Sequence, residues 1–291
     1  VVDLDRSNDA IVLAGVALLL VGLLFKVAAV PFHFWTPDVY QGAPTPVTGF
    51  MASAAKAAAF VAMLRVVVVG LGHFSTDYLP VLWVVALLTL VVGAVMGVVQ
   101  SDVKRMLAFS SVSHAGFMLV GVVGAAHEPG SLASNGARAV LVYTMVYAVL
   151  ALGTFAAVTA VARTGDTATD ISSFRGLGRS RPAFALGVTV LLLAQAGVPL
   201  TSGFVAKFGV ISVAVEHHSY VLAVLAMVSA VIAAYLYLRI MISMWVADEE
   251  SGDAAREVVR IPRLLGLALT VSVVFTLVVG FFPDPLLGIA P

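Results

Sequence analysis

Three lysines in this sequence stand inside long apolar segments. Lys26 lies toward the end of an uncharged run, Lys56 is surrounded by small residues, and Lys207 follows a stretch with glycine and proline. Ionisable groups are costly in such segments, so they are functional candidates by default. Burial disfavours the ammonium form and a nearby carboxylate favours it, so a change in pairing can make a lysine release or bind a proton. We therefore predict proton transfer by these lysines, although Lys26 also fits a side chain that extends to the membrane interface.

Two histidines are candidates for a relay between the lysines. His33 follows Lys26 by seven residues, on the same face and about 10 Å away if one helix continued through both. His114 shares a helical face with Ser110 and Ser111, which would give one polar stripe suited to water and proton passage. Each histidine also has a simpler interpretation, since His33 fits an interfacial aromatic cluster and His114 fits a hydrogen-bonded structural residue.

Two other polar rows are predicted to hold helices together rather than to carry protons. They are Tyr143, Tyr147 and Thr154 in one apolar segment, and Tyr235, Arg239 and Ser243 in another. Polar side chains at helical spacing in apolar segments commonly form hydrogen bonds between helices.

The composition is that of a membrane protein. Hydrophobic residues make up 61% of the 291 residues and charged residues only 11%, whereas soluble domains are nearer half apolar and a quarter charged. The sequence contains no cysteine, which excludes disulfides and thiolate-held clusters, and its net charge of zero favours no nucleic-acid partner. We therefore expect the lipid bilayer to be the main surroundings of the chain.

Eight apolar segments of roughly 20 residues are each long enough to cross a bilayer as a helix. We place them at residues 10–35, 47–70, 80–100, 105–124, 138–162, 183–215, 219–246 and 264–282. A closed barrel is excluded because these runs are continuous and do not alternate. The prediction is an all-α polytopic membrane protein that forms a single transmembrane domain over residues 1–291.

The basic residues predict an orientation in the membrane. With eight crossings, most Lys and Arg residues outside the segments fall on one side, namely Lys104, Arg105, Arg163, Arg175, Arg179, Arg181, Arg256, Arg260 and Arg263. The other side has only Arg6 and Arg138. An excess of Lys and Arg marks the cytoplasmic face, so both ends of this chain are expected on the outer, periplasm-like side.

Two of the segments are expected to be broken helices. Pro31 interrupts the first, and Gly197, Pro199 and Gly203 interrupt the sixth. Proline removes a hydrogen-bond donor and clashes with the preceding turn, and broken backbone at membrane depth is tolerated where it lines protein or a wet cavity. Interrupted segments in corresponding positions of two halves indicate the inverted repeats of a transporter.

The charges in the segments are unbalanced, because they include lysine and arginine but no Asp or Glu. We expect a carboxylate that pairs with these basic residues to come from upstream sequence or from a neighbouring subunit. Alternatively, water takes its place. The first residues show neither an initiator Met nor a signal peptide, so we expect the chain to begin partway through a longer protein. The sequence has no Walker A or dinucleotide motif and too few histidines for haem, so we expect no cofactor or metal bound by this chain.

Three motifs resemble one known family. They are PFHFWTPDVYQGAPTP at 31–46, between Lys26 and Lys56, then DVKRMLAFSSVSHAG at 102–116 and AGVPLTSGFVAKF at 196–208. In this order and spacing they are similar to the antiporter-like membrane subunits of respiratory complex I, NADH:quinone oxidoreductase. The sequence TPDVYQGAP within the first motif resembles the subunit N branch, the counterpart of mitochondrial NADH dehydrogenase subunit 2.

The resemblance implies two inverted five-helix repeats, each with a broken helix: residues 1–70 would end the first repeat, 80–246 would form the second, and 264–291 a C-terminal helix. It implies that Lys26 is the lysine of the first broken helix, Lys56 the linking lysine, and Lys207 the lysine of the second. The family pairs the first lysine with a glutamate on an earlier helix, which has no counterpart here. NADH, flavin, iron–sulfur clusters and quinone are expected in partner subunits, in a bacterial inner membrane.

With this resemblance, the function we expect first is a proton-translocating subunit of NADH:quinone oxidoreductase, driven by electron transfer in other subunits. Two alternatives remain open beside it. One is the same fold in a multi-subunit cation/proton antiporter with no redox partner. The other is a structural membrane subunit whose polar groups only hold helices together.

Overall fold

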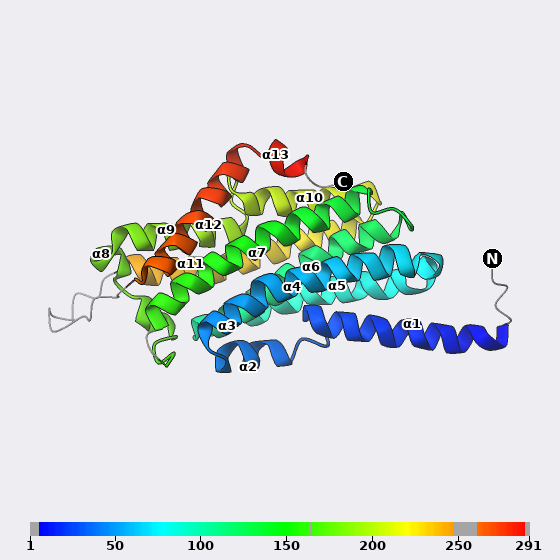
Figure 1. Cartoon of the computed structure of the whole chain (residues 1–291), viewed down its shortest axis with the longest axis horizontal. Helices are drawn as coiled ribbons and strands as arrows, with labels where there is room; N and C mark the ends of the chain where they lie inside the picture. The colour runs from blue at the N-terminus through cyan, green and yellow to red at the C-terminus, as the bar shows by residue number, and fades with distance from the viewer. Residues whose placement is uncertain (1–5, 163–164, 247–260, 289–291) are drawn as a thin grey trace.

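The computed structural model describes residues 6–162, 165–246 and 261–288, and every regular element in these ranges is helical. The helices form an elongated bundle in which most run along the long axis (Figure 1). The main helices are α1 (Arg6–Val27), α2 (Trp35–Gly42), α3 (Thr45–Phe50), α4 (Lys56–Leu64), α5 (Ser75–Val98), α6 (Val103–Ala126), α7 (Asn135–Ala162), α9 (Pro182–Ala196), α10 (Ser202–Glu216), α11 (Tyr220–Trp245) and α12 (Arg263–Phe281). Short helices α8 (Leu177–Ser180) and α13 (Asp284–Leu287) complete the set.

Seven helices in the described residues are long and apolar enough to cross a membrane. One of them is continuous over Thr45–Gly70 and includes α3, α4 and two π-helical stretches, Met51–Ala55 and Arg65–Gly70. The segment predicted at 183–215 is instead two helices of 15 residues each, α9 and α10. The all-helical membrane fold with broken helices is therefore confirmed, and the sixth predicted crossing is divided between two half-length helices.

Helix α6 is the centre of the bundle, because every residue of its apolar stretch is buried. It packs closely against α5, where a Cβ at Gly116 would lie 2.6 Å from the backbone nitrogen of Leu90. Helices α2, α7, α10 and α11 also contact α6. Polar groups on α6 are consequently enclosed by protein from several sides.

The first break begins earlier than the sequence predicts. Helix α1 ends at Val27, and residues 28–34 are irregular, so the segment 10–35 is not one helix. Pro31 has no N–H to donate to the carbonyl oxygen of Val27, four residues earlier, and its ring would clash with that carbonyl, so a regular helix cannot continue past Val27 through Pro31. The N–H of Val30 instead donates to Thr89 Oγ1 on α5 at 3.0 Å, which fixes the irregular segment to the bundle.

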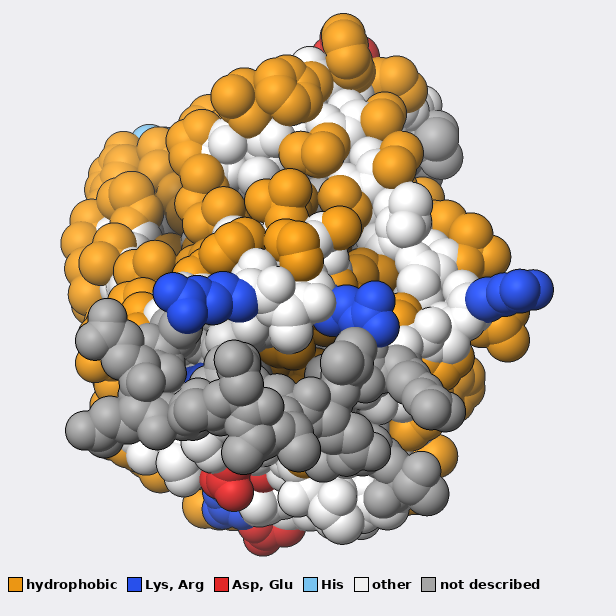
Figure 2. Space-filling model, turned by 90° about the vertical axis from the view of Figure 1, so that its left-hand side faces the viewer, with side chains coloured by type: hydrophobic (Ala, Val, Ile, Leu, Met, Phe, Trp, Pro, Cys, Tyr) orange, Lys and Arg blue, Asp and Glu red, His pale blue; other side chains and the backbone are white. Residues whose placement is uncertain are grey.

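Basic side chains gather at the end of the bundle that contains α8, which Figure 2 shows end-on. Four of the arginines predicted for the cytoplasmic face are exposed: Arg175, Arg179, Arg181 and Arg263. Arg163, Arg256 and Arg260 lie outside the described residues. Lys104 differs from this group because its side chain is buried.

Candidate functional site

Lys56 is buried beside α6. It is 4% exposed, and its ammonium donates to the carbonyl oxygen of Ser111 at 2.8 Å and to Ser111 Oγ at 2.5 Å. The π-helical stretch Met51–Ala55 ends immediately before Lys56, and such local widening of a helix is frequent at functional sites. The hydroxyl of Tyr40, from α2, lies 3.4 Å from the same Ser111 Oγ. Ser111 is therefore where the side chains of α2 and α4 meet α6.

His114 lies one turn further along α6 and is hydrogen-bonded through both ring nitrogens. Nδ1 is 2.8 Å from the hydroxyl of Tyr143, on α7, and Nε2 is 3.0 Å from the hydroxyl of Tyr237, on α11. Tyr237 is also 2.6 Å from Ser110 Oγ. A neutral imidazole has one donor and one acceptor nitrogen, so a change of tautomer would reverse the direction of both bonds. The ring is held so that it can receive a proton on one side and release one on the other.

Lys207 lies beside the second break. Its ammonium donates to the carbonyl oxygens of Gln195 at 2.9 Å and Ala196 at 2.8 Å, which end helix α9. The last carbonyls of a helix have no intrahelical partner and carry partial negative charge. The break therefore supplies the acceptors for the lysine.

Gly197 makes room for this arrangement. It has a φ of +89°, and a Cβ added there would lie 2.8 Å from Lys207 Cδ. A left-handed conformation and close contact with a side chain both favour glycine. The polar chain continues from the break to α7, because Gln195 Nε2 donates to Thr154 Oγ1 at 2.6 Å.

The structure thus brings together three of the five predicted site residues, Lys56, His114 and Lys207. Lys56 binds Ser111 and Lys207 lies over the ring of Phe117, and these two contacts are each three residues, about one turn, from His114 on α6. In the part of the chain that the structure describes, the two amines are held by neutral oxygen atoms rather than by carboxylates. Aromatic faces cover them, since Lys56 lies 5.9 Å from the centroid of the Tyr147 ring and Lys207 lies 5.0 Å from that of Phe117.

The other two predicted residues, Lys26 and His33, lie apart from this group. Lys26 is in the last turn of α1 with its side chain exposed, and so is not enclosed by the described residues. His33 is buried in the irregular segment, with its ring 4.7 Å from that of Phe34 and 6.4 Å from that of Phe109. Because the helix ends at Val27, Lys26 and His33 do not share a helical face. Their roles in proton transfer stay predictions.

The two polar rows differ in outcome. Tyr143 forms a hydrogen bond between helices as expected, since it bonds to His114 on α6, and the Tyr147 ring lies 4.7 Å from the same imidazole. On α11 the site residue is Tyr237 and not Tyr235, which is 54% exposed. The two tyrosines are about 200° apart around the helix, so only one can face the core. The sequence alone does not distinguish the two tyrosines, because both lie in the same continuous apolar run.

The described residues contain no group of three or more His, Asp and Glu side chains that could hold a metal ion. What the site offers is a series of amines, hydroxyls and one imidazole. Such groups can bind and exchange protons, and Lys56, His114 and Lys207 are all buried.

Comparisons with known proteins place this chain in a family. Residues 4–233 match the transmembrane family described as NADH:quinone oxidoreductase/Mrp antiporter. Subunit N of NADH-quinone oxidoreductase from Mycobacterium tuberculosis is 48% identical over 290 residues, which cover 98% of this chain and 53% of that protein. Subunit N 3 from Streptomyces griseus is 46% identical over 285 residues, covering 98% of this chain and 50% of the relative. The chain spans about half the length of these relatives.

Solved structures agree with this assignment. A chain of respiratory complex I from Thermus thermophilus with bound aureothin superposes with a TM-score of 0.78 at 33% identity, over 94% of this chain and 57% of that one. A chain of the Mrp complex from Dietzia has the same fold, with a TM-score of 0.84 at 24% identity over 98% of this chain and 59% of that one. The chain is therefore a multi-pass membrane protein that belongs to the NADH:quinone oxidoreductase/Mrp antiporter family, with subunit N of NADH-quinone oxidoreductase among its relatives.

Proposed function

We propose that the chain forms part of a proton-translocating membrane subunit of a bacterial NADH:quinone oxidoreductase. Two independent observations support this: the relatives named as subunit N of that enzyme, and the buried group of Lys56, His114 and Lys207. The second carries the mechanism, because a protein that only holds helices together has no need of two buried amines without a carboxylate beside them. NADH, flavin, iron–sulfur clusters and quinone would belong to partner subunits, and other membrane subunits would adjoin this one.

The proposed path runs along α6. Lys56 gives a proton to the Ser111 hydroxyl oxygen, 2.5 Å from the amine, and Ser111 releases its own hydroxyl proton to the next acceptor in the same step. Ser110, Tyr237 and His114 form the next connected stretch, with separations of 2.6 Å and 3.0 Å. Water completes the steps between Ser111 and Ser110 and between His114 and Lys207. The break between α9 and α10 then gives Lys207 access to the far side.

Lys26 would precede Lys56 in this path. Its exposed amine needs an opposite charge, and a carboxylate on a further segment or on a neighbouring subunit would supply it. A change in that pairing would raise or lower the tendency of Lys26 to hold its proton. Redox energy from the partner subunits would arrive here as such a change of charge or shape.

The proposal is tested by replacing each buried lysine in the assembled enzyme. We expect Lys56→Ala and Lys207→Ala to lower the number of protons translocated per electron in membrane vesicles. Lys56→Arg and Lys207→Arg keep the charge but release a proton far less readily, so these variants should also translocate fewer protons per electron. Unaltered pumping in both alanine variants would refute the assigned roles.

A stand-alone cation/proton antiporter is the second candidate. The description of the matched family, which includes the Mrp antiporter, favours it. Sodium-dependent proton movement in vesicles without NADH or quinone would support this function, and its absence alongside NADH-driven pumping would support the first.

A further inference from the structure

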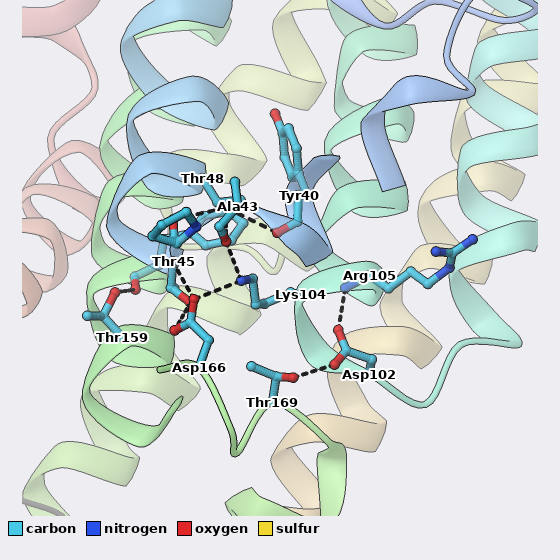
Figure 3. A network of polar contacts seen from close by, with 12 residues as sticks. Tyr40, Ala43, Thr45, Thr48, Asp102, Lys104, Arg105, Thr159, Asp166 and Thr169 are labelled. Carbon is cyan, nitrogen blue, oxygen red and sulfur yellow. Dashed lines mark hydrogen bonds and ion pairs between the residues drawn. The ribbon is translucent and has the colours of Figure 1, made fainter. Parts of the chain in front are cut away.

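Lys104 is the most enclosed charged residue of the described chain outside the site. Its side chain is 1% exposed, although its position at the start of α6 predicted an interfacial lysine. The ammonium donates to the carbonyl oxygen of Ala43 at 2.7 Å and to Asp166 Oδ2 at 3.1 Å (Figure 3). An interfacial lysine on the cytoplasmic side would keep its ammonium in water. The burial of Lys104 in an ion pair therefore needs another explanation.

Asp166 binds both Lys104 and Thr45, the first residue of α3. Its Oδ2 accepts the N–H of Thr45 at 2.8 Å, and its Oδ1 accepts the Thr45 hydroxyl at 2.7 Å (Figure 3). Ala43 and Thr45 flank the bend between α2 and α3. The ion pair therefore forms hydrogen bonds to the chain on both sides of this bend, which we call the elbow (residues 43–45).

The segment that carries Asp166 is itself fixed to α6. Thr169 donates its hydroxyl to Asp102 Oδ2 at 2.5 Å, and its carbonyl oxygen accepts the N–H of Val103 at 2.8 Å. Asp102 also caps α6 by accepting the N–H of Arg105 at 2.9 Å. The segment that contains Asp166 is thus attached to the start of α6, which is also where Lys104 lies.

The two arms of the elbow lead to the proposed proton path. Tyr40 lies on α2, and Lys56 lies at the start of α4, beyond α3. Both reach Ser111, which follows Lys104 by seven residues and so lies about 10 Å further along α6. Thr48 Oγ1 donates to the carbonyl oxygen of Tyr40 at 3.1 Å, which joins the arms close to the elbow. A movement of the elbow would change both contacts with Ser111.

We infer that the Lys104–Asp166 ion pair is a positioning device: it holds the elbow so that Lys56 stays within hydrogen-bond distance of Ser111. The inference rests on the proposed function, because it assigns the pair a role in proton transfer through Lys56. Neither residue exchanges the transported proton; both act through the backbone of Ala43 and the first residue of α3.

The test separates positioning from simple stability. Asp166→Asn removes the charge that Lys104 needs, and Lys104→Met removes the ammonium, so each single variant disturbs a buried pair. The double variant Lys104→Met with Asp166→Asn has no uncompensated charge and should assemble normally. Asp166→Glu keeps the charge and the acceptors. Glu216→Gln, an exposed acidic residue at the end of α10, is the matched control.

Each variant is measured in the assembled enzyme in membrane vesicles, with electron transfer and proton translocation recorded together. We expect the ratio of protons to electrons to fall to about half or less in both single variants, since a misplacement of ~1 Å at reacting groups can cost far more. The ratio should stay low in the double variant although its assembly recovers, while Asp166→Glu keeps most of the ratio and Glu216→Gln keeps all of it.

Two results would overturn the inference while leaving the proposed function intact. One is an unchanged ratio in the single variants when Lys56→Ala lowers it. The other is a ratio that recovers together with assembly in the double variant, which would make the pair a structural element only. If the single variants fail to assemble, the proton-to-electron ratio of the double variant still distinguishes a positioning role of the pair from a purely structural one. A normal ratio in Lys56→Ala would instead reject the proposed function itself.

Discussion

The ammonium of Lys207 lies 2.8 Å from the carbonyl oxygen of Ala196, across the break that separates α9 from α10. The lysine is on the second half-helix and its acceptors are on the first. The amine therefore connects the two halves, and any shift between them changes its surroundings. The break is therefore part of the proposed proton site and not only an interruption of a helix.

Gly197→Ala should disturb this connection. The left-handed conformation costs an alanine about 1–2 kcal/mol, and the new Cβ would press on Lys207 Cδ. We expect a lower thermal unfolding temperature and reduced proton translocation. Gly209→Ala, in the same α10 helix but with only an ordinary contact to Ala139, should be close to native. Equal effects from the two variants would contradict the special role of Gly197.

Tyr237→Phe removes the hydroxyl that joins His114 to Ser110. Both partners would be left buried and without this bond, at a cost of about 1–3 kcal/mol. Proton translocation should fall strongly, measured in vesicles at equal amounts of enzyme. Tyr235→Phe, on the exposed side of the same helix, is the control and should pump normally. Native pumping by Tyr237→Phe would remove this tyrosine from the path.

His114→Gln distinguishes a relay from a structural histidine. The glutamine amide can still form hydrogen bonds, but it cannot bind a proton or change tautomer. We expect normal assembly with much reduced proton translocation, whereas His73→Gln at an exposed position should have no effect. A fully active His114→Gln enzyme would favour the structural interpretation that the sequence left open.

Asp166 predicts a dependence of stability on pH. Burial by itself would raise the pKa of Asp166, but hydrogen bonds from Thr45 and the ion pair with Lys104 outweigh it, so the pKa lies below its ordinary value of 3.8. A carboxyl whose pKa is lowered by folding stabilises the folded state above its unfolded pKa, and this contribution is lost as the pH falls through the folded pKa.

The native protein should consequently be more stable than Asp166→Asn at neutral pH, and the difference should shrink below about pH 4. Thermal unfolding of both proteins in detergent across this range measures the difference. A difference that stays constant with pH would show that the charge of Asp166 contributes nothing.

Much of the fold and part of the site could be predicted from the sequence. Continuous apolar runs predicted the membrane helices, and Gly197 with Pro199 predicted the second break, because these signals act through local backbone chemistry. The stripe of Ser110, Ser111 and His114 was predicted from helical spacing alone, and the structure confirms that these residues face other polar groups.

The remainder depended on which helices meet. Tyr237 and Tyr235 look alike in the sequence, and only packing against α6 decides that Tyr237 reaches His114. Lys104 was counted with the interfacial basic residues, since nothing nearby in the chain indicates that Asp166, 62 residues later, would pair with it. The end of α1 at Val27 was missed because the apolar run continues past it, whereas the backbone restrictions imposed by Pro31 end the helix.

The central claim is that Lys56 and Lys207 act in one proton path, and a double-mutant cycle in the assembled enzyme tests it most directly. Protons translocated per electron are measured for Lys56→Met, Lys207→Met and the double variant. We predict that each single variant lowers the ratio and that the double variant is no worse than the more severe single one, because a path interrupted once is already closed. Additive losses would mean two separate paths, and a native ratio in all three variants would contradict the account.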